Sequence, residues 1–156
     1  MGYTHYWEMQ RDFTDDEWTR ITEGAREIAE KCKQHFDFGN WGGSHRVKFP
    51  TINETKIAFN GVGDDSHETF FLTKEATVED WRTAHFAFCK TARKPYDIGV
   101  VSILAWAKRV APDAINISSD GEEDVFEKGT YQYRDIGVLQ PDTPLEKLSK
   151  RLNHDS

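Results

Sequence analysis

Three cations gather in one short segment near the middle of the chain. Residues 86–97 read FAFCKTARKPYD, in which Lys90, Arg93 and Lys94 stand among apolar and aromatic residues. Phosphate is held best by cationic donors where water is partly excluded, and arginine adds a two-pronged contact. The flanking apolar residues indicate that this backbone is anchored on a core. The alternative is a solvated basic loop, because three basic residues are a weak signal.

A histidine stands among aromatic residues near the N-terminus, in the segment GYTHYWEM at residues 2–9. Alternation along a strand would place Tyr3, His5 and Trp7 on one face. The imidazole could act as a general acid or base, or donate to a phosphate, and the neighbouring rings could stack on bases. The alternative is that this face belongs to the core and that His5 is an ordinary strand residue.

The strength of these contacts indicates the kind of ligand. Hydrogen bonds to charged groups contribute about 1.5–3 kcal/mol each, whereas association costs about 4–15 kcal/mol. Stacking adds about 1–3 kcal/mol per base, so a ligand with both phosphates and bases fits better than inorganic phosphate. We therefore expect a nucleotide ligand. The residues expected to contact its phosphates and to stack on its bases are, respectively, Lys90, Arg93 and Lys94, and Tyr3, Trp7 and Tyr96.

An enzyme is a second interpretation of the same residues. His5 would be the acid or base of a phosphoester cleavage, with Asp97 or Asp120 orienting its ring. The sequence holds no second matching histidine motif, nucleophile elbow, P-loop or HExxH motif, so binding without turnover is preferred. We expect no metal and no cofactor, because the acidic cluster at residues 64–68 is more simply a solvated hairpin tip.

The overall composition excludes several classes of function. The formal net charge is −7, whereas general binding to duplex DNA or to a membrane surface needs a basic footprint. The two cysteines form no CxxC pair, which argues against a disulfide scaffold or a zinc cluster. We see no signal peptide, and the longest apolar run, residues 99–107, is too short to span a bilayer. We expect a cytoplasmic protein; a monomer and an oligomer are both compatible with this composition.

Periodicity and capping predict the elements that position these residues. Residues 2–9 are typical of a strand. Thr14 and Glu17 form a capping box, and apolar residues then recur every three or four positions to about Gln34, which predicts an amphipathic helix. Residues 37–54 contain three glycines and a proline, and are typical of an extended loop.

The pattern from residue 56 onward predicts a hairpin, a short strand, another long helix and a further strand. Asp97 can cap that helix, and Pro112 lies beyond its end. The expected ranges are 56–61 and 68–74 for the hairpin, 85–91 for the short strand, 97 to about 109 for the helix, 114–118 for the last strand and a short helix from about residue 122.

The order of the main elements, β-α-β-β-α-β, predicts an α+β fold of the ferredoxin-like type, with an insertion before the second long helix. Such a fold is a four-stranded antiparallel sheet with both helices on one face. Residues 2–9 and 68–74 would be its central strands, and their exposed face would bind the ligand. We expect a single domain over residues 1–139 and a C-terminal tail, residues 140–156, with a short helix capped at Thr143.

Three strings, MGYTHYW at the start, FCKTARKPYD in the centre and SSDG at residues 118–121, resemble a family of small proteins of tailed phages, prophages and bacteria. The resemblance extends from Met1 to about Gly121 and does not include residues 122–156. It implies a phage protein in the host cytoplasm and no particular reaction.

With the expected ligand, this setting suggests a counter-defence protein that sequesters a linear or cyclic nucleotide signal of host immunity. The alternative is a protein-interaction module. It would inhibit a host enzyme through its aromatic surface or through the leucine stripe at residues 145–152.

Overall fold

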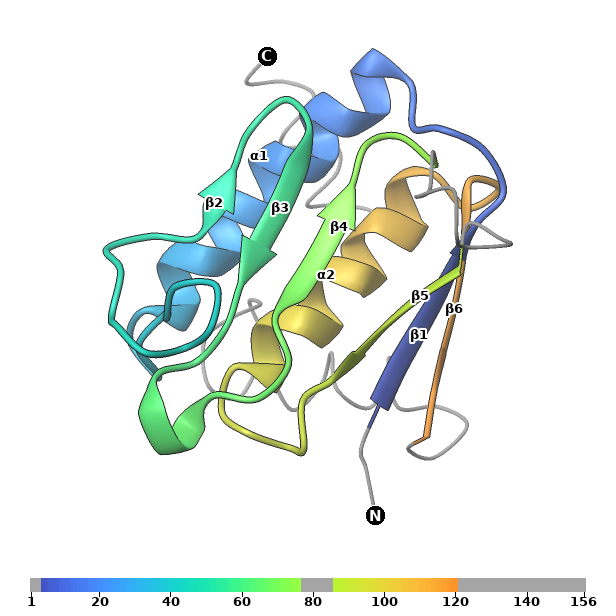
Figure 1. The fold of residues 1–156 in the computed structure, drawn as a ribbon. Coiled ribbons are helices and arrows are strands. Elements are labelled where there is room, and N and C mark those ends of the chain that lie inside the picture. The colour runs from blue at the N-terminus through green and yellow to red at the C-terminus, as the bar shows by residue number, and fades with distance from the viewer. Residues whose placement is uncertain (1–3, 77–85, 121–156) are drawn as a thin grey trace, which may run out of the picture.

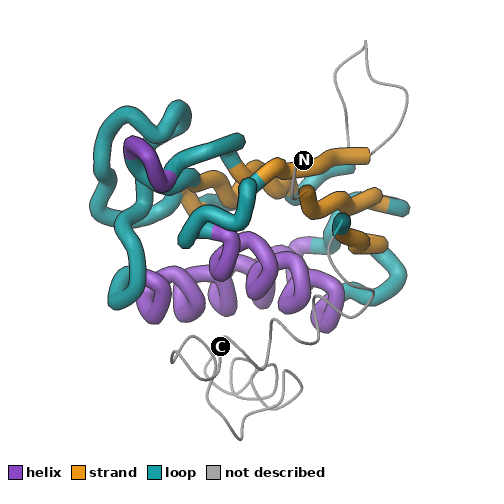
Figure 2. The backbone as a smooth tube through the Cα atoms, turned by 90° about the horizontal axis from the view of Figure 1, so that it is seen from below, coloured by secondary structure: helices purple, strands orange, loops and turns teal. Residues whose placement is uncertain are grey.

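The structure is a computed structural model that describes residues 4–76 and 86–120. Two antiparallel sheets of three strands each lie side by side in one layer, and two helices cover one face of that layer (Figure 1 and Figure 2). The α+β class expected from the sequence is therefore confirmed. Neither helix in the described part of the chain is long and apolar enough to cross a membrane.

The first sheet has β1 at its centre. In spatial order its strands are β5 (Phe86–Lys90), β1 (Thr4–Met9) and β6 (Ile115–Ser119). Within it, His5 pairs with Cys89 on one side and with Ser119 on the other. Paired residues of an antiparallel sheet share a face. These three side chains therefore point to the same side of the sheet, which is the side covered by the helices.

The second sheet contains the expected hairpin. In spatial order its strands are β2 (Thr51–Ile52), β3 (Lys56–Phe59) and β4 (Phe70–Thr73), and the link between β3 and β4 includes a single 3-10 turn, η1 (Gly63–Asp65). β3 and β4 pair antiparallel, so the hairpin is confirmed. β2 is a two-residue strand at the end of a segment that the sequence predicts to be loop throughout.

The ferredoxin-like strand order is not confirmed. Both edges of β1 are occupied, by β5 and β6, so the strand expected at residues 68–74 is not its neighbour. β5 lies between them and adjoins the start of β4, where the Glu68 amide donates to the Lys90 carbonyl at 3.1 Å. The short segment before the second long helix thus lies between β1 and the start of β4, where its pairing with β1 satisfies backbone groups of both strands.

The helices are α1 (Asp15–Cys32) and α2 (Asp97–Val110). The capping box of α1 is confirmed: the Glu17 amide donates to the Thr14 hydroxyl at 3.1 Å, and the Thr14 amide donates to the Glu17 carboxylate at 2.8 Å. α2 differs from expectation, since Tyr96 occupies the N-cap position and Asp97 begins the helix. The helix expected near residue 122, the boundary at residue 139 and the C-terminal tail lie outside the described residues.

Candidate functional site

The buried imidazole of His5 joins three elements at one end of the first sheet. Its side chain has no exposed surface. Its Nε2 lies 2.6 Å from Oδ1 of Asp97, in the first turn of α2, and its Nδ1 lies 2.9 Å from Oγ of Ser119, at the end of β6. The Thr91 hydroxyl donates to the same Asp97 oxygen at 2.6 Å. One carboxylate oxygen therefore accepts two hydrogen bonds from buried donors.

An ionised carboxylate can only accept, so the His5 Nε2 that faces Asp97 carries a hydrogen. The single hydrogen of the Ser119 hydroxyl has two acceptors within reach, which are Nδ1 of His5 at 2.9 Å and the Thr4 carbonyl at 3.4 Å. When Ser119 donates to Nδ1, the imidazole is neutral and can accept the hydroxyl proton. A serine, a histidine and an aspartate in this order form the arrangement in which imidazole acts as a base toward a hydroxyl. The sequence offered Asp97 or Asp120 as the orienting carboxylate. The structure places Asp97 there, whereas Asp120 accepts from the Tyr6 hydroxyl at 2.9 Å.

Two of the rings expected to stack on bases belong to the core. Trp7 is 3% exposed and packs against Phe70 with ring centroids 5.3 Å apart. Tyr96 is fully buried, and its hydroxyl donates to the Glu68 carbonyl at 2.5 Å. Neither ring offers a face to a ligand, because the helix-covered side of the sheet encloses both. Tyr3 lies outside the described residues.

The basic segment forms a tight loop between β5 and α2. Ala92 and Arg93 both have left-handed backbones, with φ of 51° and 58°. Such a conformation costs about 1–2 kcal/mol per non-glycine residue, so the surroundings must impose it. The Lys94 amide donates to the Thr91 carbonyl at 2.9 Å, and the buried Thr91 hydroxyl holds the start of the loop to α2. Arg93 is exposed and Lys94 half-buried on this constrained loop.

The side of the first sheet that the helices do not cover carries two rings, Phe86 and Phe88, that the sequence interpretation did not select as binding residues. Phe86 and Phe88 are 43% and 46% exposed, and their ring centroids are 6.2 Å apart. Tyr6 stacks on Phe86 at 5.9 Å, and the Lys90 ammonium lies 5.7 Å from the Phe88 ring centre. We call Tyr6, Phe86, Phe88 and Lys90 the outer aromatic strip.

The alternation in FAFCK contains the signal for this strip. Alternation places Phe86, Phe88 and Lys90 on one face of the strand and Ala87 and Cys89 on the other. The structure buries Cys89 and leaves both phenylalanines outside. The same alternation separates Lys90 from His5, which pairs with the inward Cys89. The histidine and that lysine therefore lie at the same end of the sheet but on opposite faces, and they do not converge on one hollow.

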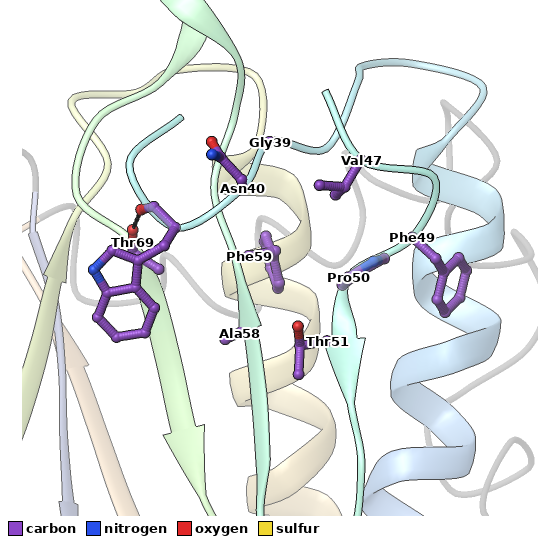
Figure 3. A pocket seen from close by; sticks show the side chains of 10 residues that line it. Gly39, Asn40, Val47, Phe49, Pro50, Thr51, Ala58, Phe59 and Thr69 are labelled. Carbon is purple, nitrogen blue, oxygen red and sulfur yellow. Dashed lines mark hydrogen bonds between the residues drawn. The ribbon is translucent and has the colours of Figure 1, made fainter. Parts of the chain in front are cut away.

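A pocket of about 190 Å³ opens on the second sheet. Its wall is the loop that precedes β2, and β3 contributes Ala58 (Figure 3). Trp41 also lines it and is 66% exposed. The Trp41 ring meets Phe71 edge to face at 5.5 Å, and the Lys56 ammonium lies 5.5 Å from the Phe71 ring centre. The second sheet thus has an exposed aromatic group beside a lysine, as the first sheet does.

Other candidates for chemistry offer less. Among residues 4–76 and 86–120, no group of three or more histidine, cysteine or acidic side chains is arranged to hold a metal ion. Burial raises the pKa of both thiols, Cys32 and Cys89, to about 12. The thiolate is the reactive form of cysteine, so neither residue is suited to act as a nucleophile.

Comparisons with known proteins do not indicate a function for this chain. No protein-family model matches the chain, and neither a curated protein nor a solved structure does. The resemblance to phage proteins stays a prediction. The contacts of the outer aromatic strip, the basic loop and the His5 centre therefore carry the functional argument.

Proposed function

We propose that the protein binds a nucleotide on the outer face of the first sheet. The observation that carries this proposal is the order of residues along β5 and beyond it. Phe86, Phe88 and Lys90 alternate onto one face, and the chain then enters the loop that holds Arg93 and Lys94. A base would stack on the exposed phenylalanine rings, and phosphate would lie toward the lysine and the loop.

The exposed rings support a binding role because apolar groups gathered on a protein surface mark interaction sites. Stacking of a base on an aromatic side chain contributes about 1–3 kcal/mol and tolerates any base. A lysine acts toward phosphate as a point charge, and an arginine can contact two phosphate oxygens at once. The strip and the loop therefore offer both kinds of contact that a nucleotide requires.

The charge distribution restricts how a nucleotide could lie. Glu8 and Asp120 border the strip on the side away from β5. On the β5 side, a carboxylate oxygen of Glu68 lies 3.4 Å from the Lys90 amide nitrogen, so an anionic group is favoured at the Lys90 ammonium and at the basic loop beyond it. The net charge of −7 also disfavours a long polyanion. A short ligand, whose phosphates all lie near the loop that holds Arg93 and Lys94, fits this distribution of charges best.

Isothermal titration calorimetry against a panel of mononucleotides and of linear and cyclic oligonucleotides tests the proposal. We expect the Phe86→Ala/Phe88→Ala double variant to weaken binding by about 1–3 kcal/mol, since the base that stacks on these rings loses its partner. Leucine at both positions retains apolar area without a ring and should also weaken binding. Lys90→Ala should weaken binding, whereas Lys31→Ala, in the last turn of α1 on the helix side, should not.

Two results would contradict nucleotide binding. One is the absence of heat and of any melting-temperature shift with every member of the panel. The other is unchanged affinity in the double phenylalanine variant while circular dichroism shows a native fold. Stoichiometric capture of one host protein, together with the first result, would support the protein-interaction alternative.

The resemblance to phage proteins supports a narrower form of the proposal, in which the ligand is a nucleotide signal of host defence that is sequestered without turnover. A sequestering protein returns the ligand unchanged. Denaturing the complex and analysing the released nucleotide by chromatography distinguishes capture from cleavage.

Phosphoester cleavage is a second candidate function, favoured by the Ser119–His5–Asp97 contacts. The Ser119 hydroxyl would attack phosphorus while its proton passes to Nδ1 of His5. The P–O bond to the leaving alcohol would break, and that oxygen would take the proton from His5. Water would then release the phosphoryl group by the reverse proton transfers. Intact nucleotide after prolonged incubation, with and without Mg²⁺ or Mn²⁺, would rule this out; a product lost in Ser119→Ala and His5→Gln would support it.

A further inference from the structure

The two sheets meet at a seam between the end of β5 and the start of β4. At this seam the Glu68 amide donates to the Lys90 carbonyl at 3.1 Å, and the Cys89 thiol donates to the Glu68 carbonyl at 3.3 Å. One residue further along, the Thr69 hydroxyl donates to the Trp41 carbonyl. The loop that carries Trp41 is therefore attached to the second sheet at the point where that sheet adjoins the first.

These contacts place one aromatic group on each side of the seam. On one side lies Trp41, with its exposed ring packed on Phe71 and with Lys56 close to the same cluster. On the other side lies Phe88, with Lys90 over its ring at the seam itself. The strands of both sheets lie in one layer, and both helices lie on one side of it (Figure 2). Lys90 contacts the aromatic group of the first sheet, and its backbone lies at the seam with the second.

The pocket beside Trp41 has a mostly apolar lining with two polar side chains. It is lined by apolar groups of Val47, Pro50 and Ala58, and by the polar side chains of Asn40 and Thr51 (Figure 3). Ligand pockets are mostly apolar, with a few polar groups that fix orientation. A flat ring could stack on Trp41 with its edge toward these polar groups.

We propose that the ligand of this protein is a dinucleotide, with one base on Phe88, the other on Trp41 beside the pocket, and a phosphate between them at Lys90. This inference rests on the proposed nucleotide-binding function and adds the ligand class to it. A mononucleotide would engage one aromatic group only. A long strand would extend its phosphates past the seam, across the acidic surface of the first sheet.

The experiment compares mononucleotides with linear and cyclic dinucleotides of purines and pyrimidines by calorimetry. With the wild-type protein, the preferred dinucleotide should bind at least about tenfold more tightly than either of its mononucleotides, because a second stacked base adds to the first. Trp41→Ala should reduce dinucleotide affinity to the mononucleotide level and leave mononucleotide affinity unchanged. Trp41→Phe keeps a ring and should retain part of the advantage.

Phe88→Ala separates this inference from the function on which it rests. It should weaken both ligand classes, because it removes the stacking partner beside Lys90. If Phe88→Ala weakens binding but Trp41→Ala leaves the dinucleotide unaffected, the dinucleotide inference is wrong and nucleotide binding stands. If no nucleotide binds, both are wrong. The inference would also be overturned if the wild-type protein bound mononucleotides and dinucleotides with equal affinity.

Discussion

Replacing Asp97 with alanine would remove the acceptor that holds the His5 centre together. The Nε2 hydrogen of His5 and the hydroxyl of Thr91 both bond to Oδ1 of Asp97, each at 2.6 Å. His5 and Thr91 have no exposed surface, and the Asp97 side chain is only 14% exposed. Water therefore has little access to replace the lost carboxylate, and two buried donors would be left without this partner.

The expected decrease in the free energy of unfolding follows from the loss of these two hydrogen bonds. Each bond to a charged acceptor contributes about 1.5–3 kcal/mol, and breaking a buried charged pair by removing one partner costs about 3–5 kcal/mol. We expect Asp97→Ala to lower the free energy of unfolding by about 3–5 kcal/mol. Asp97→Asn keeps an oxygen in the Oδ1 position and loses only the charge, so it should cost roughly half as much. Thr91→Val removes one of the two donors and should also cost less.

Urea denaturation followed by tryptophan fluorescence and circular dichroism measures these differences. The reasoning requires the order wild type, Asp97→Asn, Asp97→Ala, from most to least stable. An alanine variant within about 0.5 kcal/mol of wild type, the range usual for surface substitutions, would refute the buried centre. An asparagine variant as unstable as the alanine variant would show that the acceptor oxygen is not what the two donors require.

Three further predictions concern the core and the surface. Gly24→Ala would place a Cβ 2.1 Å from Nε1 of the buried Trp106; we expect a loss of about 1–3 kcal/mol from overpacking, and a higher melting temperature would contradict it. The Arg11 guanidinium donates to Glu17 and lowers the pKa of that carboxyl to about 2 from 4.5, so stability should fall as the pH drops from about 4.5 to about 2; Glu17→Gln should flatten this dependence in acid titrations. Since burial raises the pKa of both thiols to about 12, Ellman's reagent should react with them only after denaturant is added.

Local sequence patterns were sufficient to predict the elements that are stabilised by contacts between neighbouring residues. The α1 capping box, its amphipathic helix and the β3–β4 hairpin depend on contacts between residues close in the chain, and all three are confirmed. The short strand at residues 85–91 was also expected and corresponds to β5. Asp97, which pairs with the histidine, was one of the two aspartates considered.

The neighbour of each strand and the buried face of each strand came only from the tertiary structure. Alternation shows that His5 and Trp7 share a face, but it is equally satisfied whichever face the helices cover. The helices cover that face, so Trp7 lies in the core and Phe86 and Phe88 are left outside. Likewise, nothing local indicates that β5 pairs with β1, some eighty residues earlier. That choice depends on long-range burial, and it decides which rings a ligand can reach.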